Sequence, residues 1–313
     1  MKIVFFGSGD FGIPLLEMIS RYAPNNNVIV VTHPPRKQGR GLKILPSPVE
    51  EKAFVLNFKV INQENLKDKE FINLISVFLP DFIIVSDYGK LIPAEIIDLA
   101  NKNKIKTVNV HPSLLPLYRG ATPIQSVLIN GEKTTGVTLQ ILSKKIDAGD
   151  ILLQEVIEIS DDDNFLSLKL KLQNIATRLL ETYLLKPDSV IPRPQLDSNA
   201  TFCYKISNEV FTTDWKEEAI RILNKMRAFY PKGLKCFFRE NIIKIIKGEI
   251  FSFQDKDEPG MIRVLNKDTL IVSCINGWLK LTELKPENRK IISGKDFING
   301  YKPVSGEKLR SIL

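Results

Sequence analysis

The sequence predicts two domains: an α/β domain with a doubly wound, mostly parallel sheet, and then a small β-barrel. Three observations predict this fold class. Short apolar runs alternate with helix-like stretches through the first 185 residues, which is typical of a parallel sheet with helices on both faces. A stretch with three prolines follows at 187–194 and has the composition of a linker. Beyond the prolines, short apolar runs are closely spaced, as in small barrels.

The first domain is predicted strand by strand from its apolar runs. Strands are expected at 2–6, 27–32, 81–86, 105–110, 135–142 and 151–159. Helical periodicity marks the stretches 11–22, 48–57, 65–79, 93–102 and 122–130. A longer helix over 164–185 closes the domain. We therefore expect a first domain over 1–189 and a linker over 190–208.

The second domain is expected over 209–313 and has a different pattern. One amphipathic helix covers 214–229. Short strand-like runs follow at 235–239, 242–253, 260–265, 269–274 and 277–284, divided by Gly and Asn-Lys-Asp turns. This spacing indicates a small barrel, and an oligonucleotide-binding (OB-like) barrel is one architecture that fits it.

Composition excludes several classes of protein. The chain has 313 residues, of which 43% are hydrophobic and 26% charged, as in ordinary soluble globular proteins. No apolar run reaches the roughly 18 residues of a membrane helix, and the first residues lack the layout of a signal peptide. Cys203, Cys236 and Cys274 lie far apart, which argues against a cysteine-built zinc site and suits a reducing compartment. We expect a cytoplasmic protein with no metal centre and no membrane segment.

The positive charge of the chain is unevenly placed. The net charge is +8, and residues 191–313 carry 22 Lys and Arg against 15 Asp and Glu. The remaining residues carry 22 against 21. A basic domain after a nearly neutral one indicates a polyanionic partner, with nucleic acid as the leading candidate. The alternative is a lysine-rich surface that is only solvated.

A glycine pattern follows the first apolar run. Gly7, Gly9 and Gly12 form G-x-G-x-x-G, the fingerprint of a dinucleotide-binding turn. That reading also needs an acid about 20 residues further on, and no Asp or Glu occurs between Glu17 and Glu50. Arg36 could bind the 2′-phosphate of NADP, and this residue alone keeps an NADP-linked oxidoreductase open as an alternative. Otherwise the glycines form a tight turn that lets a ligand or another backbone segment come close.

Polar residues gather at the end of the run 105–110. Asn109 and His111 are two positions apart, so their side chains face the same side of a strand. Ligands of open α/β sheets bind at the carboxyl ends of strands, and an amide with an imidazole suits an oxyanion and a proton. Asp147, in a loop beside Gly149, could orient the imidazole. The alternative is that these residues cap turns.

These residues also carry a resemblance. The segment "NVHPSLLPLYRGATPIQ" at 109–125, followed by "IDAGDILL" at 146–153, resembles the formyltransferases that use 10-formyltetrahydrofolate. The similarity extends to "SDYGKLIP" at 86–93, which resembles a wall of the folate pocket. It also includes the basic stretch 33–49 and the segments "CYKIS", "TDW" and "FYPKG", which resemble members of the family that act on tRNA.

The resemblance implies a Rossmann-like catalytic domain, a tRNA-binding C-terminal barrel, and formyl transfer to the α-amino group of methionyl initiator tRNA. It implies that Asn109 and His111 stabilise the oxyanion, and that Asp147 relays protons and orients His111. The folate donor would contact Ser113, Leu114, Leu115, Pro116, Tyr88, Gly89, Leu91, Ile92 and Asp150. The acceptor end of the tRNA would contact Arg36, Lys37, Arg40 and Lys43. We expect a monomer without a metal.

The sequence departs from the family pattern in two stretches. The first turn reads "GSGDF" where G-T-x-[DE]-F is usual, and "HPPRK" stands in place of Q-P-D-R-P, so that Pro35 replaces an acid.

Three other functions stay open. A formyltransferase of a small amine, such as glycinamide ribonucleotide or an amino sugar, would share the three catalytic residues. A hydrolase of the formyl donor would also share them. The third alternative is the oxidoreductase.

Overall fold

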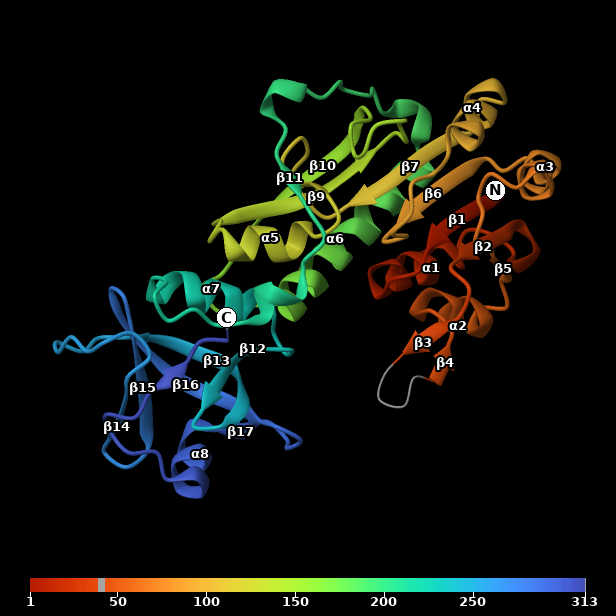
Figure 1. The fold of residues 1–313 in the computed structure, drawn as a ribbon. Coiled ribbons are helices and arrows are strands. Elements are labelled where there is room, and N and C mark those ends of the chain that lie inside the picture. The colour runs from red at the N-terminus through yellow and green to blue at the C-terminus, as the bar shows by residue number, and fades with distance from the viewer. Residues whose placement is uncertain (39–42, 313) are drawn as a thin grey trace. The chain divides into compact units, whose positions relative to one another are not determined.

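The structure, a computed structural model, describes residues 1–38 and 43–312 (Figure 1). The chain splits into two compact units. Unit 1 contains Met1–Pro123, Thr134–Glu158 and Lys169–Cys203. Unit 2 contains Ile124–Lys133, Ile159–Leu168 and Tyr204–Leu313.

Unit 1 is built on a seven-stranded sheet in the order β10-β9-β7-β6-β1-β2-β5. Its strands are β1 (Ile3–Gly7), β2 (Val28–Thr32), β5 (Lys59–Asn62), β6 (Phe82–Ser86), β7 (Lys106–His111), β9 (Thr134–Gln140) and β10 (Ile151–Glu158). The five strands from β7 to β5 are parallel, while β9 and β10 run antiparallel to their neighbours. The predicted doubly wound, mostly parallel sheet is confirmed.

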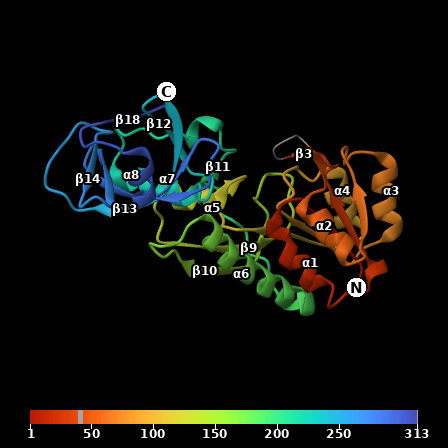
Figure 2. The same ribbon diagram turned by 90° about the horizontal axis from the view of Figure 1, so that it is seen from below.

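Helices cover both faces of this sheet (Figures 1 and 2). They are α1 (Ile13–Ile19), α2 (Pro48–Val55), α3 (Lys69–Phe78), α4 (Ala94–Lys102) and α6 (Phe165–Leu185). On one face, Val4 and Phe6 of β1 join Phe71 of α3 and Ile96 of α4 in a buried apolar cluster. Helix α2 begins with a capping box, in which Ser47 accepts from the Glu50 amide. Such a cap satisfies amide donors that the first turn leaves free.

Short elements complete unit 1. Strands β3 (Arg36–Gln38) and β4 (Lys43–Leu45) form an antiparallel hairpin, and β8 (Arg119–Gly120) pairs in parallel with β11 (Phe202–Cys203). Single turns of 3₁₀ helix occur at η1 (Asp10–Gly12), η2 (Asn25–Asn27), η3 (Pro187–Ser189) and η4 (Asp197–Asn199). The β8–β11 pair ties the end of unit 1 to the loop after β7.

Unit 2 is a curled antiparallel sheet in the order β14-β15-β16-β13-β12-β18, with β17 on β16. Its elements are η5 (Asn208–Phe211), β12 (Leu234–Phe238), β13 (Asn241–Phe251), β14 (Ile262–Leu265), β15 (Thr269–Cys274), β16 (Gly277–Pro286), β17 (Ile292–Ser293), β18 (Leu309–Arg310), α7 (Ala219–Ala228) and α8 (Gly294–Tyr301). Helix α5 (Pro123–Ile129) belongs to this unit from Ile124 onward.

The two edges of this sheet meet. The amide of Ile262 donates to the Glu307 carbonyl at 2.8 Å, and the amide of Leu309 donates to the Gly260 carbonyl at 2.8 Å. Trp215, Met226 and Phe297 are fully buried in the core that the curled sheet encloses with α7 and α8. The predicted small barrel-like second domain is therefore confirmed as a curled antiparallel sheet.

Residues 1–38 and 43–312 contain neither a membrane-spanning helix nor a metal-binding cluster. No helix there combines the length and apolar character needed to cross a membrane. No group of three or more His, Cys, Asp or Glu side chains there is arranged to hold a metal ion.

Candidate active site

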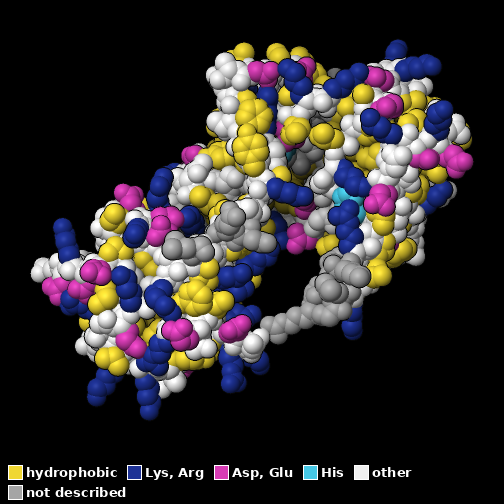
Figure 3. Space-filling model, in the orientation of Figure 1, with side chains coloured by type: hydrophobic (Ala, Val, Ile, Leu, Met, Phe, Trp, Pro, Cys, Tyr) yellow, Lys and Arg dark blue, Asp and Glu magenta, His cyan; other side chains and the backbone are white. Residues whose placement is uncertain are grey.

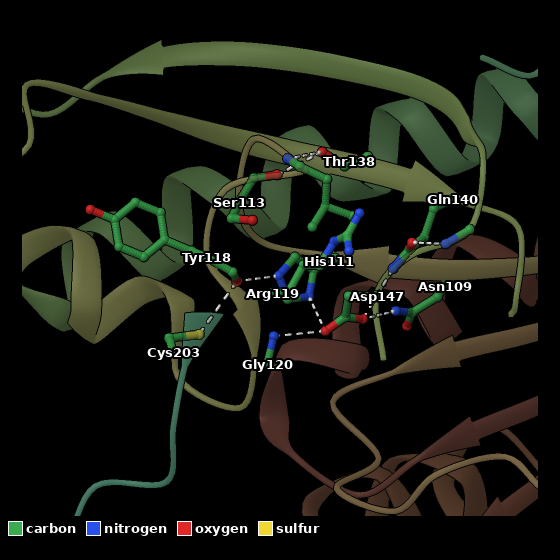
Figure 4. Close-up of polar contacts among 12 residues, drawn as sticks. Asn109, His111, Ser113, Tyr118, Arg119, Gly120, Thr138, Gln140, Asp147 and Cys203 are labelled. Atoms are coloured by element: carbon green, nitrogen blue, oxygen red, sulfur yellow. Dashed lines mark hydrogen bonds and ion pairs between the residues drawn. The ribbon is translucent and has the colours of Figure 1, made fainter. Parts of the chain in front are cut away.

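The candidate site is built on neighbouring strands β7 and β9. Asn109 lies directly opposite Gln140, and His111 lies directly opposite Thr138. Residues two apart on a strand share one face, and directly opposed residues share it too. The antiparallel pairing therefore places these four polar side chains on a single face of the sheet (Figure 4).

Asp147 lies at the centre of this group (Figure 4). Its Oδ1 accepts from Asn109 Nδ2 at 2.8 Å and from Gln140 Nε2 at 3.0 Å. Its Oδ2 accepts from the Gly120 amide at 2.8 Å and lies 3.7 Å from His111 Nδ1. Each oxygen of the carboxylate therefore faces two nitrogens. The carboxylate fixes two side chains of β7 and β9 and one backbone amide at once.

His111 is buried, with 5% of its surface exposed. Its Nε2 lies 2.9 Å from the carbonyl oxygen of Tyr118, and its Nδ1 faces Asp147. Both ring nitrogens therefore face oxygen atoms of the protein, which fixes the orientation of the imidazole ring. The same Tyr118 carbonyl accepts from Cys203 Sγ at 3.3 Å. Cys203 of β11 therefore helps to hold the carbonyl group that faces the imidazole ring.

Close backbone approaches hold the loops of the site together. A Cβ on Gly120, whose φ is +121°, would lie 2.1 Å from the Cys203 carbonyl oxygen. A Cβ on Gly149 would lie 1.8 Å from the Ile141 carbonyl oxygen. Neither position accepts a side chain, because contacts this short exceed any tolerable overlap. Asp147 itself has φ +46°, a conformation that non-glycine residues seldom adopt.

The loop 113–116 is fixed from within the protein. Thr138 Oγ1 donates to the Ser113 carbonyl at 2.7 Å and accepts from the Leu115 amide at 3.1 Å. Gln154 Nε2 donates to the Leu115 carbonyl at 3.0 Å. Ser113 and Leu115 are buried, whereas Leu114 and Pro116 are half-buried. The first two residues shape the loop, and the other two retain some open surface.

The other residues predicted to contact the folate donor differ in exposure. Gly89, Leu91 and Asp150 are exposed, Ile92 is half-buried and Tyr88 is buried. Tyr88 stacks on His33 with 4.8 Å between ring centroids, and loss of hydration raises the pKa of Tyr88 to about 12. The phenol therefore stays neutral at any physiological pH. His33 Nε2 lies 2.6 Å from the Tyr88 carbonyl oxygen, so the ring also holds the backbone of this segment.

Three of the four residues predicted to contact tRNA lie on strands β3 and β4. Arg36 and Lys43 are exposed at its two strands, and Lys37 lies within β3. Arg40 lies outside the described residues.

The glycine turn after β1 is occupied by the protein itself. The amides of Ser8 and Gly9 donate to the Asp87 carbonyl oxygen at 3.1 and 3.0 Å. A Cβ on Gly9 would lie 1.6 Å from Asp87 Oδ2, and the Phe11 amide donates to the same side chain. The glycines therefore allow close approach of Asp87, and the turn gives no support to a bound dinucleotide.

Sequence reasoning missed several residues of this site: Tyr118, Gly120, Thr138, Gln140 and Gln195. Gln195 Nε2 donates to the Asp147 carbonyl at 3.0 Å although 48 positions separate the two residues. Gln140 and Thr138 reach the site through the antiparallel register of β9. Polar residues at the end of an apolar strand were a usable signal for Gln140. A lone Gln in a proline-rich stretch gave no signal for Gln195.

The chain matches the descriptions of two protein families. A family described as formyl transferase matches residues 1–184, and one described as formyl transferase, C-terminal domain matches residues 205–302.

Curated relatives match over their full length. A protein of Caldanaerobacter subterraneus subsp. tengcongensis named methionyl-tRNA formyltransferase is 36% identical over 99% of this chain and all of the relative. A protein of Dictyoglomus thermophilum with the same name is 38% identical over 98% of this chain and 99% of the relative.

Solved structures share the fold. WlaRD, a sugar 3N-formyl transferase crystallised with dTDP and 5-N-formyl-THF, aligns with a TM-score of 0.66 at 19% identity. That alignment covers 93% of this chain and 99% of the other. An N-formyltransferase of Helicobacter canadensis aligns with a TM-score of 0.65 at 20% identity, over 91% of this chain and 99% of the other.

Proposed function

Since this chain belongs to the formyl transferase family, we propose that it transfers the formyl group of 10-formyltetrahydrofolate to the α-amino group of methionyl initiator tRNA. The observation that carries this proposal is the extent of the match. A relative named methionyl-tRNA formyltransferase aligns over 99% of the chain, both units included. A formyltransferase of a small amine, a hydrolase of the donor and an NADP-linked oxidoreductase are not favoured.

The reaction needs hydrogen-bond donors where negative charge develops, on the formyl oxygen under attack. We assign this task to Asn109 and His111. The amide nitrogen of Asn109 has two hydrogens, and one is used in the 2.8 Å bond to Asp147. The other is available to the formyl oxygen. His111, on the same face of the same strand, is the second group assigned to the formyl oxygen.

The reaction also needs proton movement, because the attacking ammonium loses a proton and the leaving nitrogen N10 gains one. The predicted roles of Asp147 were proton relay and orientation of His111. Its two oxygens face four nitrogens, which supports orientation most directly. For a relay, the carboxylate has to release one of these partners, and the 3.7 Å contact with His111 is the longest of them.

The donor is assigned to the segments 88–92 and 113–116 and to Asp150. Leu91 is 66% exposed, and an exposed leucine gives the flat apolar face of a folate ring something to pack against. Gly89, with φ +75° and no side chain, leaves its backbone open to the polar ring edge. Ser113 and Leu115 act by holding their loop, since both are buried.

The tRNA acceptor stem is assigned to the β3–β4 hairpin with Arg36, Lys37, Arg40 and Lys43, and the rest of the tRNA to unit 2. In unit 2, Lys235 pairs with Lys244 across β12 and β13, and Lys244 pairs with Lys285 across β13 and β16. Loss of hydration and then these neighbouring charges lower the pKa of Lys244. Like charges directly opposite destabilise a sheet, so a phosphate partner accounts for the row. Lys and Arg side chains are also spread over the face of unit 2 that Figure 3 shows.

We place catalysis in residues 1–189 and tRNA binding in residues 209–313, with 190–208 as the connection. We also propose that the protein acts as a monomer in the cytoplasm. The three cysteines are buried and free, as expected in a reducing compartment. Sedimentation of the purified chain would test the monomer, and a stable dimer would overturn it.

The direct test is formyl transfer from 10-formyltetrahydrofolate to methionyl initiator tRNA, compared with methionyl elongator tRNA, glycinamide ribonucleotide and a nucleotide amino sugar. We expect product with the initiator tRNA and little with the small amines. Faster transfer to a small amine would overturn the proposal. Donor breakdown without any formyl product would identify a hydrolase instead.

The lysine row offers a second test. Changing Lys235, Lys244 and Lys285 to Gln should raise the KM for tRNA and flatten its dependence on salt, because fewer phosphates release their counterions. The exposed Lys295 of α8 provides a matched control as Lys295→Gln. An unchanged salt dependence in the triple variant would show that the row is only solvated.

A further inference from the structure

The segment after α6 reaches back to the centre of the candidate site, although its sequence reads as a linker. Gln195 Nε2 donates to the Gly149 carbonyl at 2.6 Å and to the Asp147 carbonyl at 3.0 Å. It also lies 3.2 Å from Gln140 Oε1. One side-chain nitrogen of this segment therefore holds the backbone of the Asp147 loop at two carbonyl groups.

Gln140 links this segment to the carboxylate itself. Its Nε2 donates to Asp147 Oδ1 at 3.0 Å, and its Oε1 accepts from the Gly149 amide at 3.1 Å. Gln195 thus contacts both the backbone of the loop and the side chain that orients its acid. A non-glycine residue at φ +46° persists only where its surroundings determine it. These two glutamines provide that restraint for Asp147.

The orientation of Gln195 is fixed by a buried cation. Arg119 donates from Nη2 to Gln195 Oε1 at 2.8 Å and from Nε to the same oxygen at 3.1 Å. Only 4% of the Arg119 side chain is exposed, and its Nη1 pairs with Asp197 at 2.9 Å. Because the oxygen of the amide must face the guanidinium, its NH₂ group must face the loop. Arg119 therefore selects the one amide orientation that holds Asp147.

Backbone bonds pin the segment on both sides of Gln195. Arg193 exchanges two hydrogen bonds with Ile151, at 2.7 and 2.9 Å. Further along, the Arg119 amide donates to the Thr201 carbonyl at 2.9 Å. Arg119 also lies between Tyr118, whose carbonyl faces His111, and Gly120, whose amide binds Asp147. The stretch 118–120 thus connects the segment to His111 and to Asp147.

We propose that Gln195 and Arg119 are positioning residues of formyl transfer, which hold the Asp147 loop in its working geometry without contacting substrate. This inference rests on the proposed function for the identity of the reaction only. It places one supporting residue of the site, Gln195, beyond residue 189, within the segment predicted as a linker.

The test is a double-mutant cycle in the full-length chain. Gln195→Ala should lower kcat about tenfold or more while the KM for donor and for tRNA changes less than about threefold. In an Asp147→Asn background the same change should have little further effect, because coupled residues are not additive. Ser198→Ala, on an exposed residue of the same segment, is the matched control. Additive losses in the cycle would overturn the proposal, since a merely structural role predicts them.

Arg119 gives a second variant and a conservative comparison. Arg119→Lys keeps the charge beside Asp197 but cannot bind Gln195 through two nitrogens at once. It should lower kcat in the same way and add little to Gln195→Ala. Unchanged kcat in Arg119→Lys would contradict the assigned role of the guanidinium.

A readout without any substrate separates this inference from the proposed function. Hydrogen exchange of peptides that cover 145–151 should be faster in Gln195→Ala than in Ser198→Ala or the unaltered chain, because the restraint on that loop is lost. Equal exchange would overturn the inference even if methionyl-tRNA is formylated. If no tRNA is formylated, faster exchange leaves the positioning role standing and the proposed function fails alone.

Discussion

Two aspartates in loops that follow strands of the sheet have the same unusual backbone conformation and different surroundings. Asp87 follows β6 with φ +48°, and Asp147 follows β9 with φ +46°. Asp87 contacts the backbone of the first turn: its main-chain carbonyl accepts from the amides of Ser8 and Gly9, and its side chain accepts from the Phe11 amide. Asp147 contacts one backbone amide and the side chains of Asn109, Gln140 and His111.

The difference separates a structural acid from one that organises a site. Backbone amides have one hydrogen each, so the donors on Asp87 have none left for a ligand. Asn109 retains a second hydrogen, and the His111 ring lies on the same face of the strand. Asp147 therefore aligns groups that can still act on a substrate, whereas Asp87 fills a turn. Each prediction below separates the two aspartates by a measurement.

The largest effect is expected from the side-chain partners of Asp147. Asn109→Ala and His111→Ala should each lower the rate of formyl transfer about 100- to 1,000-fold, the usual effect of losing one donor to an oxyanion. Rates are measured with saturating donor and tRNA, and near-UV circular dichroism checks the fold. A rate within twofold of the unaltered protein, for either variant, would remove that residue from the mechanism.

A smaller effect, on stability rather than rate, is expected in the turn that Asp87 fills. Gly9→Ala places a Cβ 1.6 Å from Asp87 Oδ2, and overpacking of this kind costs about 1–3 kcal/mol. The melting temperature should fall by several degrees while the rate per folded molecule is kept. Adding Asp87→Ala should restore part of the lost stability, because the overlapping carboxylate is gone. No recovery in the double variant would show that the overlap is not the cause.

The smallest effect is a change in how stability depends on pH. Loss of hydration and then the charge of Asp10 raise the pKa of Asp87 above its ordinary value. An acid whose pKa is higher when folded binds more protons in the folded state, so its contribution to stability falls as pH rises through that pKa. Asp87→Asn removes this fall in stability with rising pH, because the amide does not titrate. Its melting temperature relative to the unaltered chain should rise between about pH 4 and pH 7, and a constant difference would contradict the assignment.

Local pattern was informative where the site lies on one strand. Asn109 and His111 were paired by their spacing of two, and the structure places both beside Asp147. Gln140 was beyond reach because the register of β9 is a long-range property. Gln195 was beyond reach because its position depends on Arg119, a buried cation 76 residues away. The glycine pattern left a dinucleotide turn and a close backbone approach both open, and the contact with Asp87, which lies far along the chain, decides for the close approach.

The same reasoning applies to the fold. Apolar periodicity predicted the helices of unit 1 and six of the seven strands of its main sheet, because burial on a sheet face dictates the residue type. It did not predict the edge strand β5, in which no residue is buried. It did not predict the β3–β4 hairpin, whose exposed Ile44 and Leu45 have no core to face. Nor did it predict the pairing of β11 with β8, since two-residue strands have no period to recognise.

The most direct test of the account compares the two aspartates by isosteric substitution, Asp147→Asn and Asp87→Asn, in single-turnover formyl transfer to methionyl initiator tRNA. Asparagine keeps the shape of either side chain and removes its charge. We expect a loss of about 100-fold or more for Asp147→Asn, in line with the loss of a charge that orients a catalytic histidine. We expect a rate within about twofold for Asp87→Asn. Equal losses in the two variants, or a larger loss in Asp87→Asn, would contradict the claim that Asp147 organises the formyl-transfer site.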